Sequence, residues 1–431
     1  MTLENHWMPF TANRDFKAHP RLLTRAEGIH YWDKDGRQLL DGVSGLFNCP
    51  AGHCREEIAD AASRQLRELD YVTHFQCGHP ASFEFAKRIA QLTPEGINRV
   101  FFGNSGSEAV ESALKIALAY HHARGQGQRQ RFVGREKAYH GVNFGGTAVG
   151  GMVKNRELFG PGLPGVVHLR HTGLDENRFV KGQPATGVHL AEDLQRFVDL
   201  YGAETIAACI VEPIAGSIGV LVPPVGYLER LREICTQHGI LLIFDEVICG
   251  FGRTGKAFGA DSFGVIPDMI TMAKALTNGA QPMGAVAVRE DIYQTVTGAS
   301  SENAVEFFHG YTYSGHPVAC AVGLATLDIY EREGLFQRAA ELAPTFLDAV
   351  FALEDLPVVT DIRGYGLFAG VDMAPDGKPG TRGYEVLQRL FAEGLYVKIT
   401  GDCILLAPPF ISTPANIDRM CEILREVLSG Y

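Results

Sequence analysis

The chain has 431 residues, of which 46% are hydrophobic and 21% are charged. A chain of this size and composition can bury a large core, and we expect a soluble globular protein of two or three domains. Its 39 lysines and arginines are outnumbered by 50 aspartates and glutamates, which gives a formal net charge of −11. Because nucleic acids and anionic membrane surfaces attract basic proteins, this balance argues against both as partners.

The cysteines and the apolar runs indicate the cellular compartment. The nine cysteines are odd in number and scattered, without the spacing of disulfide or metal sites. Cys49 and Cys54 flank His53, but this compact group lacks a second ligand pair, so we expect no metal there. Residues 1–30 lack the apolar stretch of a signal peptide, and no later run approaches the ~18 apolar residues of a spanning helix. These features predict a cytoplasmic protein.

Strand and helix signals alternate from the N-terminal part onward. In residues 28–40, two apolar arms surround Asp33-Lys-Asp-Gly36, which predicts a β-hairpin. Residues 99–102 form an apolar run that ends at Gly103-Asn-Ser-Gly-Ser107, and residues 108–122 then repeat apolar side chains at helical spacing. The second pattern predicts a strand, a tight turn and a helix.

The middle of the chain contains further short apolar runs, at residues 131–134, 206–211, 240–244, 269–272 and 285–288. Their length and unbroken hydrophobicity are typical of strands that are covered on both faces. Between two of them, residues 227–238 have an amphipathic helical pattern that stops at Gly239. We therefore expect an α/β large domain with a mostly parallel sheet over residues 56–315, and a smaller domain formed by residues 1–55 and 316–431.

Two charged residues that follow expected strands suggest a cofactor. Asp245 ends the run 240–244, and Lys274 follows the run 269–272. A lysine amine can hold the aldehyde of pyridoxal phosphate as a Schiff base, and an aspartate paired with the pyridinium nitrogen keeps the ring electron-poor. Most lysines after an apolar strand are merely solvated, so this inference depends on the rest of the chain.

The turn Gly103-Asn-Ser-Gly-Ser-Glu108 is a candidate phosphate site. The free amides and the positive dipole end of the following helix can hold a dianion, and Gly106 permits close approach of the backbone. A capping box from Ser105 to Glu108 explains the same pattern equally well. The chain has neither Gly-x4-Gly-Lys-Ser/Thr nor a strand-linked Gly-x-Gly-x-x-Gly, which argues against an NTPase and a nicotinamide dehydrogenase.

A series of motifs extends this pattern over nearly the whole chain. They are Trp7-Met-Pro-Phe10, Asn104-Ser-Gly-Ser-Glu-Ala109, Ala138-Tyr-His-Gly141, Val211-Glu-Pro213, Phe244-Asp-Glu-Val247 with Gly250-Phe-Gly-Arg253, Ala273-Lys-Ala-Leu-Thr-Asn-Gly279 and His309-Gly-Tyr-Thr-Tyr-Ser-Gly-His-Pro317. In this order and spacing they resemble the class III aminotransferases, and among these the ω-amino acid:pyruvate aminotransferases. The resemblance implies the fold-type-I pyridoxal-phosphate architecture, with a mostly parallel mixed sheet in the large domain and a smaller α+β domain made from both chain ends.

The resemblance also implies roles for residues around the cofactor. Lys274 would form the Schiff base and move the proton between substrate and cofactor, while Asp245 would pair with the ring nitrogen. Tyr139 would stack on one face of the ring and Val247 would press on the other, with His140 beside them. Turn residues before Gly141 are the alternative interpretation of Tyr139 and His140.

Four further positions follow from the same resemblance. Gly106 and Ser107 would offer amides to the phosphate, and Thr312 would reach the phosphate of the neighbouring subunit. The last contact implies a homodimer with shared active sites, and pairing of two dimers into a tetramer is an alternative assembly. Thr312 as plain strand filler remains an alternative. Glu212 would lie near the substrate, although a structural glutamate before proline is an equal interpretation.

Some positions depart from the family pattern. Ile248 stands where several members have a glutamine that reaches the cofactor hydroxyl, and Phe47 stands where close relatives have a tryptophan in the substrate pocket. Lys398 replaces the arginine that usually clamps the substrate carboxylate. A lysine offers a point charge instead of a planar fork, so we expect carboxylates to be accepted with weaker discrimination against plain amines.

These groups predict an aminotransferase. An ω-amino acid such as β-alanine, or a primary amine, would give its amino group to pyruvate in a ping-pong cycle. An aminomutase or a decarboxylase would use the same lysine and aspartate, and a non-catalytic protein that keeps a pyridoxal phosphate site is a further alternative. The sequence does not fix the preferred amine or its handedness.

Overall fold

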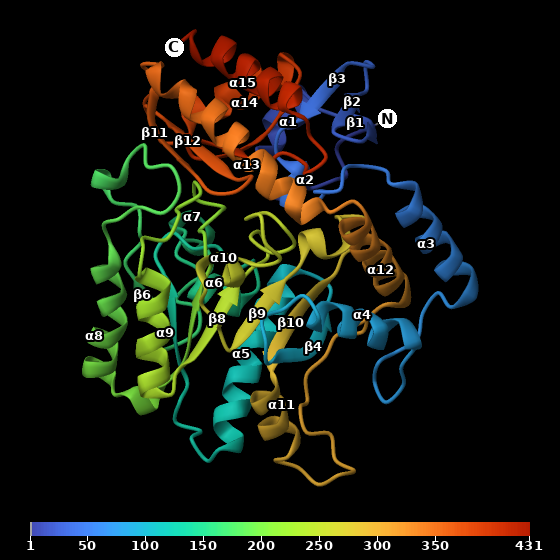
Figure 1. Ribbon diagram of the computed structural model, residues 1–431, viewed down its shortest axis with the longest axis vertical. Coiled ribbons are helices and arrows are strands. Elements are labelled where there is room, and N and C mark those ends of the chain that lie inside the picture. Colours follow the sequence, from blue (N-terminus) through green and yellow to red (C-terminus); the bar gives the residue numbers. More distant parts are fainter. Residues whose placement is uncertain (1) are drawn as a thin grey trace.

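The computed structural model describes residues 2–431 and places a seven-stranded sheet at the centre of the molecule (Figure 1). In spatial order the strands are β4 (Ile97–Gly103), β10 (Gly284–Arg289), β9 (Met269–Met272), β8 (Leu241–Asp245), β7 (Ile206–Val211), β5 (Arg131–Arg135) and β6 (Val167–Leu169). Only β10 runs antiparallel to its neighbours β4 and β9. The expected mostly parallel mixed sheet is thus confirmed.

Helices cover both faces of this sheet, as its apolar strands require. Every residue of β7, β8 and β9 is buried. Along β7, Ala208 and Ile210 join the apolar cluster that includes α5 (Gly106–Ala123), whereas Cys209 and Val211 join the larger core on the other face. This alternation follows from the two-residue period of a strand. Other helices of the large domain are α3 (Glu56–Glu68), α4 (Pro80–Ala90), α8 (Glu192–Tyr201), α9 (Tyr227–His238) and α11 (Glu290–Thr297).

The two chain ends meet in one small sheet. Its strands are β1 (Leu23–Glu27), β2 (His30–Asp33), β3 (Gln38–Asp41) and β13 (Leu395–Tyr396), and β13 pairs in parallel with β3. A second sheet contains β11 (Val359–Gly364), β12 (Ala369–Met373), β15 (Cys403–Leu406) and β14 (Lys398–Thr400). The long C-terminal helices are α12 (Pro317–Arg332), α13 (Leu335–Phe351), α14 (Thr381–Ala392) and α15 (Pro414–Leu428). This pairing accords with a domain made from both ends, whose limits remain predictions.

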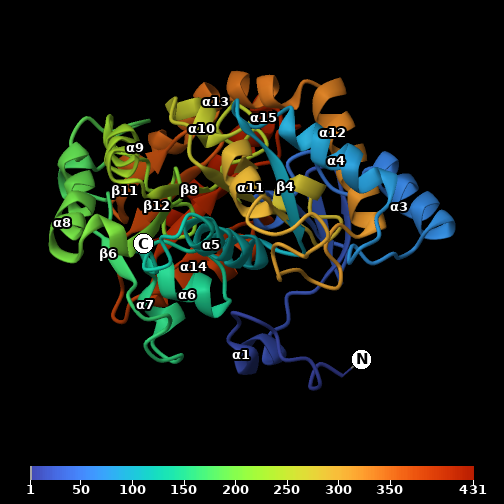
Figure 2. The same cartoon turned by 90° about the horizontal axis from the view of Figure 1, so that it is seen from below.

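Short elements complete the chain. They are α1 (Asn13–Ala18), α2 (Ser44–Phe47), α6 (Phe144–Val149), α7 (Val153–Arg156), α10 (Gly259–Phe263) and the 3-10 turns η1 (Asp175–Asn177), η2 (Val188–Ala191), η3 (Ala203–Thr205), η4 (Lys274–Thr277) and η5 (Ala352–Asp355). Figure 2 shows α1 projecting from the main body together with the N-terminal segment. Within residues 2–431, no helix is both long and apolar enough to cross a membrane.

Candidate active site

Lys274 lies at the wall of a cavity of 380 Å³. It follows β9 and begins η4 with a φ of 51°, a left-handed conformation that is uncommon outside glycine. Desolvation lowers the pKa of Lys274, while the charges of Asp245 and Glu212 oppose this effect. The site therefore favours an amine that can lose its proton and act as a base or nucleophile.

Asp245 faces the same cavity from the end of β8. Its Oδ2 lies 2.7 Å from Nδ1 of His140, and its Oδ1 accepts a hydrogen bond from the amide of Val247 at 3.2 Å. Both Asp245 and His140 are buried. Because an ionised carboxylate only accepts hydrogen bonds, Nδ1 of His140 is the donor. The pair places a carboxylate at the cavity wall, oriented from behind by the histidine.

The first turn of α5 forms another part of the wall. Ser105 caps the helix, since its hydroxyl accepts from the amide of Glu108 at 3.2 Å. The carboxylate of Glu108 instead accepts from the amide and side chain of Asn104, at 2.6 and 2.8 Å, so the reciprocal bond of a capping box is absent. Side-chain capping therefore leaves the cavity-lining Gly106 and Ser107, at the first helical positions, with amides that have no partner within the helix.

The close packing around Gly106 explains why this position lacks a side chain. A Cβ there would lie 3.2 Å from both methyl groups of Val247. Gly141 has a φ of +89°, and a Cβ on it would lie 2.5 Å from Oγ of Ser107. The segments after β8 and β5, which carry Val247 and Tyr139, thus meet the first turn of α5, which carries Ser107, and all three residues line the cavity.

Glu212 is also part of the cavity and is buried. Its Oε1 accepts from the amide of Tyr139 at 3.3 Å, and its Oε2 lies 3.6 Å from a guanidinium nitrogen of Arg135 without a hydrogen bond. Burial raises the pKa of Glu212 to about 7, and burial likewise raises the pKa of the Tyr139 phenol. Glu212 thus supports the Tyr139 loop and keeps one oxygen without a hydrogen bond, while its place beside a substrate stays a prediction.

Other expected site residues lie outside the cavity wall. Nζ of Lys274 lies 6.0 Å from the ring centroid of Phe47, which places Phe47 beside the lysine. Lys398 lines a different cavity, of 630 Å³, between residues 2–23 and 387–399. Thr312 lies in an exposed loop, where its carbonyl accepts from the hydroxyl of Tyr71 at 2.9 Å. Thr312 is thus not part of the lysine cavity of its own chain.

Several cavity residues were not anticipated as site residues. They are Asn48, Ile214, Thr277, Gln281, Pro282 and Met283. Asn48 follows Phe47, and Gln281 to Met283 follow the lysine motif, so only proximity along the chain could have indicated them. Near Asn48, His53 is hydrogen-bonded to Asp41 at 2.7 Å, and no metal-ligand group of three or more side chains occurs in residues 2–431.

The residues present fit a phosphorylated pyridine aldehyde. Within residues 2–431, Nε2 of His140 and Oε2 of Glu212 are buried without hydrogen-bond partners. The cavity therefore offers polar atoms that a ligand could bind. Free helix amides suit a dianion, the Asp245 carboxylate suits a pyridinium nitrogen, and the Lys274 amine suits an aldehyde. Ile248 also lines the cavity and offers no hydrogen bond.

Comparisons with known proteins agree with this geometry. The family model "Aminotransferase class-III" matches residues 11–428. The chain is 55% identical to "Omega-aminotransferase" of Caulobacter vibrioides, over 99% of this chain and 97% of the relative, and 50% identical to "Omega-amino acid--pyruvate aminotransferase" of Pseudomonas putida, over 100% and 96%. The solved omega transaminase of Pseudomonas jessenii in complex with PMP superposes with a TM-score of 0.93 at 32% identity, covering 99% of this chain and 96% of that chain. The chain belongs to the class-III aminotransferases.

Proposed function

We propose that this protein transfers the amino group of an ω-amino acid or primary amine to pyruvate, with pyridoxal phosphate held at Lys274. The observation that carries the proposal is the Lys274 amine sharing one cavity with Asp245, which His140 hydrogen-bonds from behind. Relatives named for ω-amino acids or β-alanine and pyruvate, each 50% identical over the whole chain, support this choice of substrates.

Each part of the cavity has a role in holding the cofactor. The amides of Gly106 and Ser107 bind its phosphate, because a helix N-terminus favours anions. Tyr139 and Val247 enclose its ring, and Asp245 pairs with the ring nitrogen. When bound, pyridoxal phosphate supplies an electron-withdrawing ring that stabilises the negative charge left by a departing proton.

Lys274 and the Asp245–His140 pair divide the chemical work. Lys274 would hold the cofactor through its aldehyde, and its amine would move a proton at the substrate carbon. Desolvation favours its neutral form, which is the form that accepts a proton. Asp245 keeps the ring nitrogen protonated, and His140 fixes the orientation of its carboxylate at 2.7 Å.

Substrate recognition involves residues around this centre. Phe47 and Tyr139 shape the side on which the substrate enters, and Glu212 lies at the same wall. Lys398 is the proposed group for the substrate carboxylate, a role that requires its amine to reach the Lys274 cavity from the separate cavity that it lines. In support, Lys398 is half-buried, desolvation lowers its pKa, and it has no ion-pair partner within residues 2–431. An unpaired amine of this kind gains more than an exposed lysine from an incoming anion.

The active enzyme is a homodimer in which Thr312 reaches the phosphate of the other subunit. An apolar hollow of 710 Å³ lies beside edge strand β4, between α4 and α11. Next to it the side chains of Phe308 and Phe83 are 90% and 71% exposed. A monomer rarely leaves such an apolar surface and a sheet edge open, which favours a second copy there. A measurement of the oligomeric state would also detect pairing of two dimers into a tetramer.

The nine free cysteines are consistent with a cytoplasmic enzyme.

Two experiments test this function. Borohydride reduction followed by peptide mapping should fix the cofactor on Lys274, with the Lys274→Ala variant as the unlabelled control. Initial rates with β-alanine and pyruvate should give parallel double-reciprocal lines, as in a ping-pong cycle. Converging lines, release of carbon dioxide or amino transfer within one molecule would instead identify a different reaction. Sedimentation of the loaded enzyme measures the oligomeric state.

A further inference from the structure

The turn that carries Lys274 is conformationally strained. Lys274 and Asn278 have φ values of 51° and 49°, and Gly279 follows with 70°. Outside glycine, such left-handed residues are uncommon and persist only where the surroundings hold them. Tyr330 of α12 holds one side, because its hydroxyl donates to the carbonyl of Ala275 at 2.6 Å. The end of the turn at Asn278, the second left-handed residue, needs an attachment of its own.

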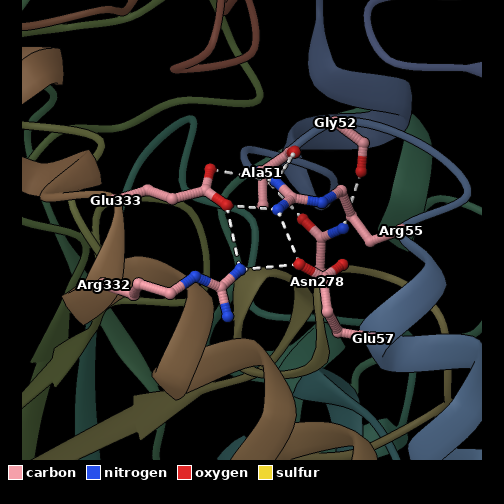
Figure 3. Close-up of polar contacts among 7 residues, drawn as sticks. All are labelled: Ala51, Gly52, Arg55, Glu57, Asn278, Arg332 and Glu333. Carbon is pink, nitrogen blue, oxygen red and sulfur yellow. Dashed lines mark hydrogen bonds and ion pairs between the residues drawn. The ribbon is translucent and has the colours of Figure 1, made fainter.

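Asn278 supplies the second attachment (Figure 3). Its Oδ1 accepts from the amide of Ala51 at 3.0 Å, and its Nδ2 donates to the carbonyl of Gly52 at 2.8 Å. The side chain is 5% exposed, so these bonds replace contacts with water. Both partners belong to the segment that also carries Phe47 and Asn48. Asn278 therefore ties the turn that carries Lys274 to the segment that carries Asn48, which also lines the cavity.

The segment that Asn278 binds is itself held in place. Arg55 donates to the carbonyl of Ala51 at 3.2 Å and to the carboxylate of Glu333, just beyond α12. Figure 3 shows Arg332 and Glu57 in the same ion-pair cluster, where Arg332 donates to Glu57 at 2.6 Å. The cluster thus connects residues 51–55 with the end of α12, and both of these elements contact the turn of residues 274–279.

We propose that Asn278 is a positioning residue for the amino transfer: its two side-chain hydrogen bonds to the backbone of Ala51 and Gly52 hold Lys274 in place relative to the segment that carries Phe47 and Asn48. The packing leaves little freedom at this junction, since a Cβ on Gly279 would lie 2.7 Å from Nδ2 of Asn48. Without the Asn278 bridge, the lysine turn moves relative to the substrate wall. The inference rests on the proposed role of Lys274 as the group that moves the substrate proton.

Two variants separate the side-chain bridge from the backbone conformation. Asn278→Gly keeps the left-handed conformation without steric cost and removes both hydrogen bonds. Asn278→Asp keeps the shape and the acceptor for Ala51, but it turns an oxygen toward the Gly52 carbonyl. Arg332→Ala is the matched control, because Arg332 belongs to the same polar cluster without touching the turn.

For both Asn278 variants we expect kcat to fall by about 10- to 100-fold, the cost of a misplacement of roughly 1 Å, with KM changed less than about threefold. The primary isotope effect with a donor deuterated at its amine-bearing carbon should rise. In the cofactor-free protein, trace acetylation of Lys274 against pH should show its pKa moving up toward the ordinary value of 10.5, because a displaced amine is better hydrated. Arg332→Ala should leave all three measurements unchanged.

The proposal is overturned if either folded variant loses thermal stability while kcat, the isotope effect and the acetylation profile of Lys274 stay as in the unaltered protein. A purely structural role would give that result. Failure of the proposed function looks different. In that case the unaltered protein shows no borohydride labelling at Lys274, whereas the acetylation profile still reports whether Asn278 positions the amine.

Discussion

Replacing His140 by alanine tests how the charge of Asp245 is maintained. The change removes a hydrogen bond of 2.7 Å between two buried groups and leaves one carboxylate oxygen without a donor. A hydrogen bond to a charged group contributes about 1.5 to 3 kcal/mol. If that energy stabilises the ionised Asp245 opposite the ring nitrogen, its loss weakens cofactor retention by about 10- to 150-fold. We expect kcat to fall as well, since the ring withdraws electrons less strongly.

The assay is the dissociation constant of pyridoxal phosphate, measured by titrating the cofactor-free protein and following absorbance. His121→Ala serves as the matched control. His121 is also fully buried, and its Nε2 bonds the carbonyl of Ala207 at 2.9 Å near the far end of α5. Both variants should lose unfolding stability, but only His140→Ala should lose affinity. Equal cofactor affinity in the two variants would refute the reasoning that His140 acts through Asp245.

Three other predictions concern pH, packing and specificity. Burial raises the pKa of Glu212 from 4.5 to about 7. Between these two pH values the folded protein holds a proton that the unfolded chain has released, so the unfolding free energy falls as the pH rises from about 4.5 to about 7. Cofactor-free Glu212→Gln should therefore gain about 2 to 3 kcal/mol in unfolding free energy relative to the unaltered protein between about pH 5 and pH 8, and a constant difference in urea titrations would contradict this. Gly141→Ala, whose Cβ would meet the first turn of α5 at 2.5 Å, should cost about 2 to 4 kcal/mol in urea unfolding, whereas Gly125→Ala, with a φ of +71° and open space, should cost about 1. Lys398→Ala should raise KM for β-alanine and pyruvate about tenfold and leave KM for a plain amine unchanged. Lys17→Ala is the control for that last prediction, because Lys17 lines the same cavity but already donates to a backbone carbonyl at 2.7 Å, and identical kinetics of the two variants would remove the role of Lys398.

Local sequence patterns were sufficient to predict the elements whose environment is uniform. Strands β7, β8 and β9 are buried along their whole length, so unbroken apolar runs identified them. The pattern failed for β6, which has only three residues, and for β1, where exposed and half-buried side chains mix without alternation. Such strands are determined by their neighbours in the sheet, and a local pattern does not contain those neighbours.

The same distinction applies to the site. Asp245 and Lys274 could be predicted because each follows a buried strand, and parallel strands place the residues after their carboxyl ends at one edge of the sheet. Asn278 could not be assigned a role, since its partners lie more than 220 residues earlier in the chain and neither partner offers a side chain that a motif would show. The lysine motif thus contains the reactive group, whereas the contacts that keep its strained turn in place come from distant parts of the chain, namely the Tyr330 hydroxyl and backbone atoms of Ala51 and Gly52. A chain that kept the lysine motif but altered residues 51–55 would keep the reactive amine and lose the contacts that position it. For this reason, resemblance in the motif alone predicts the reaction better than its rate.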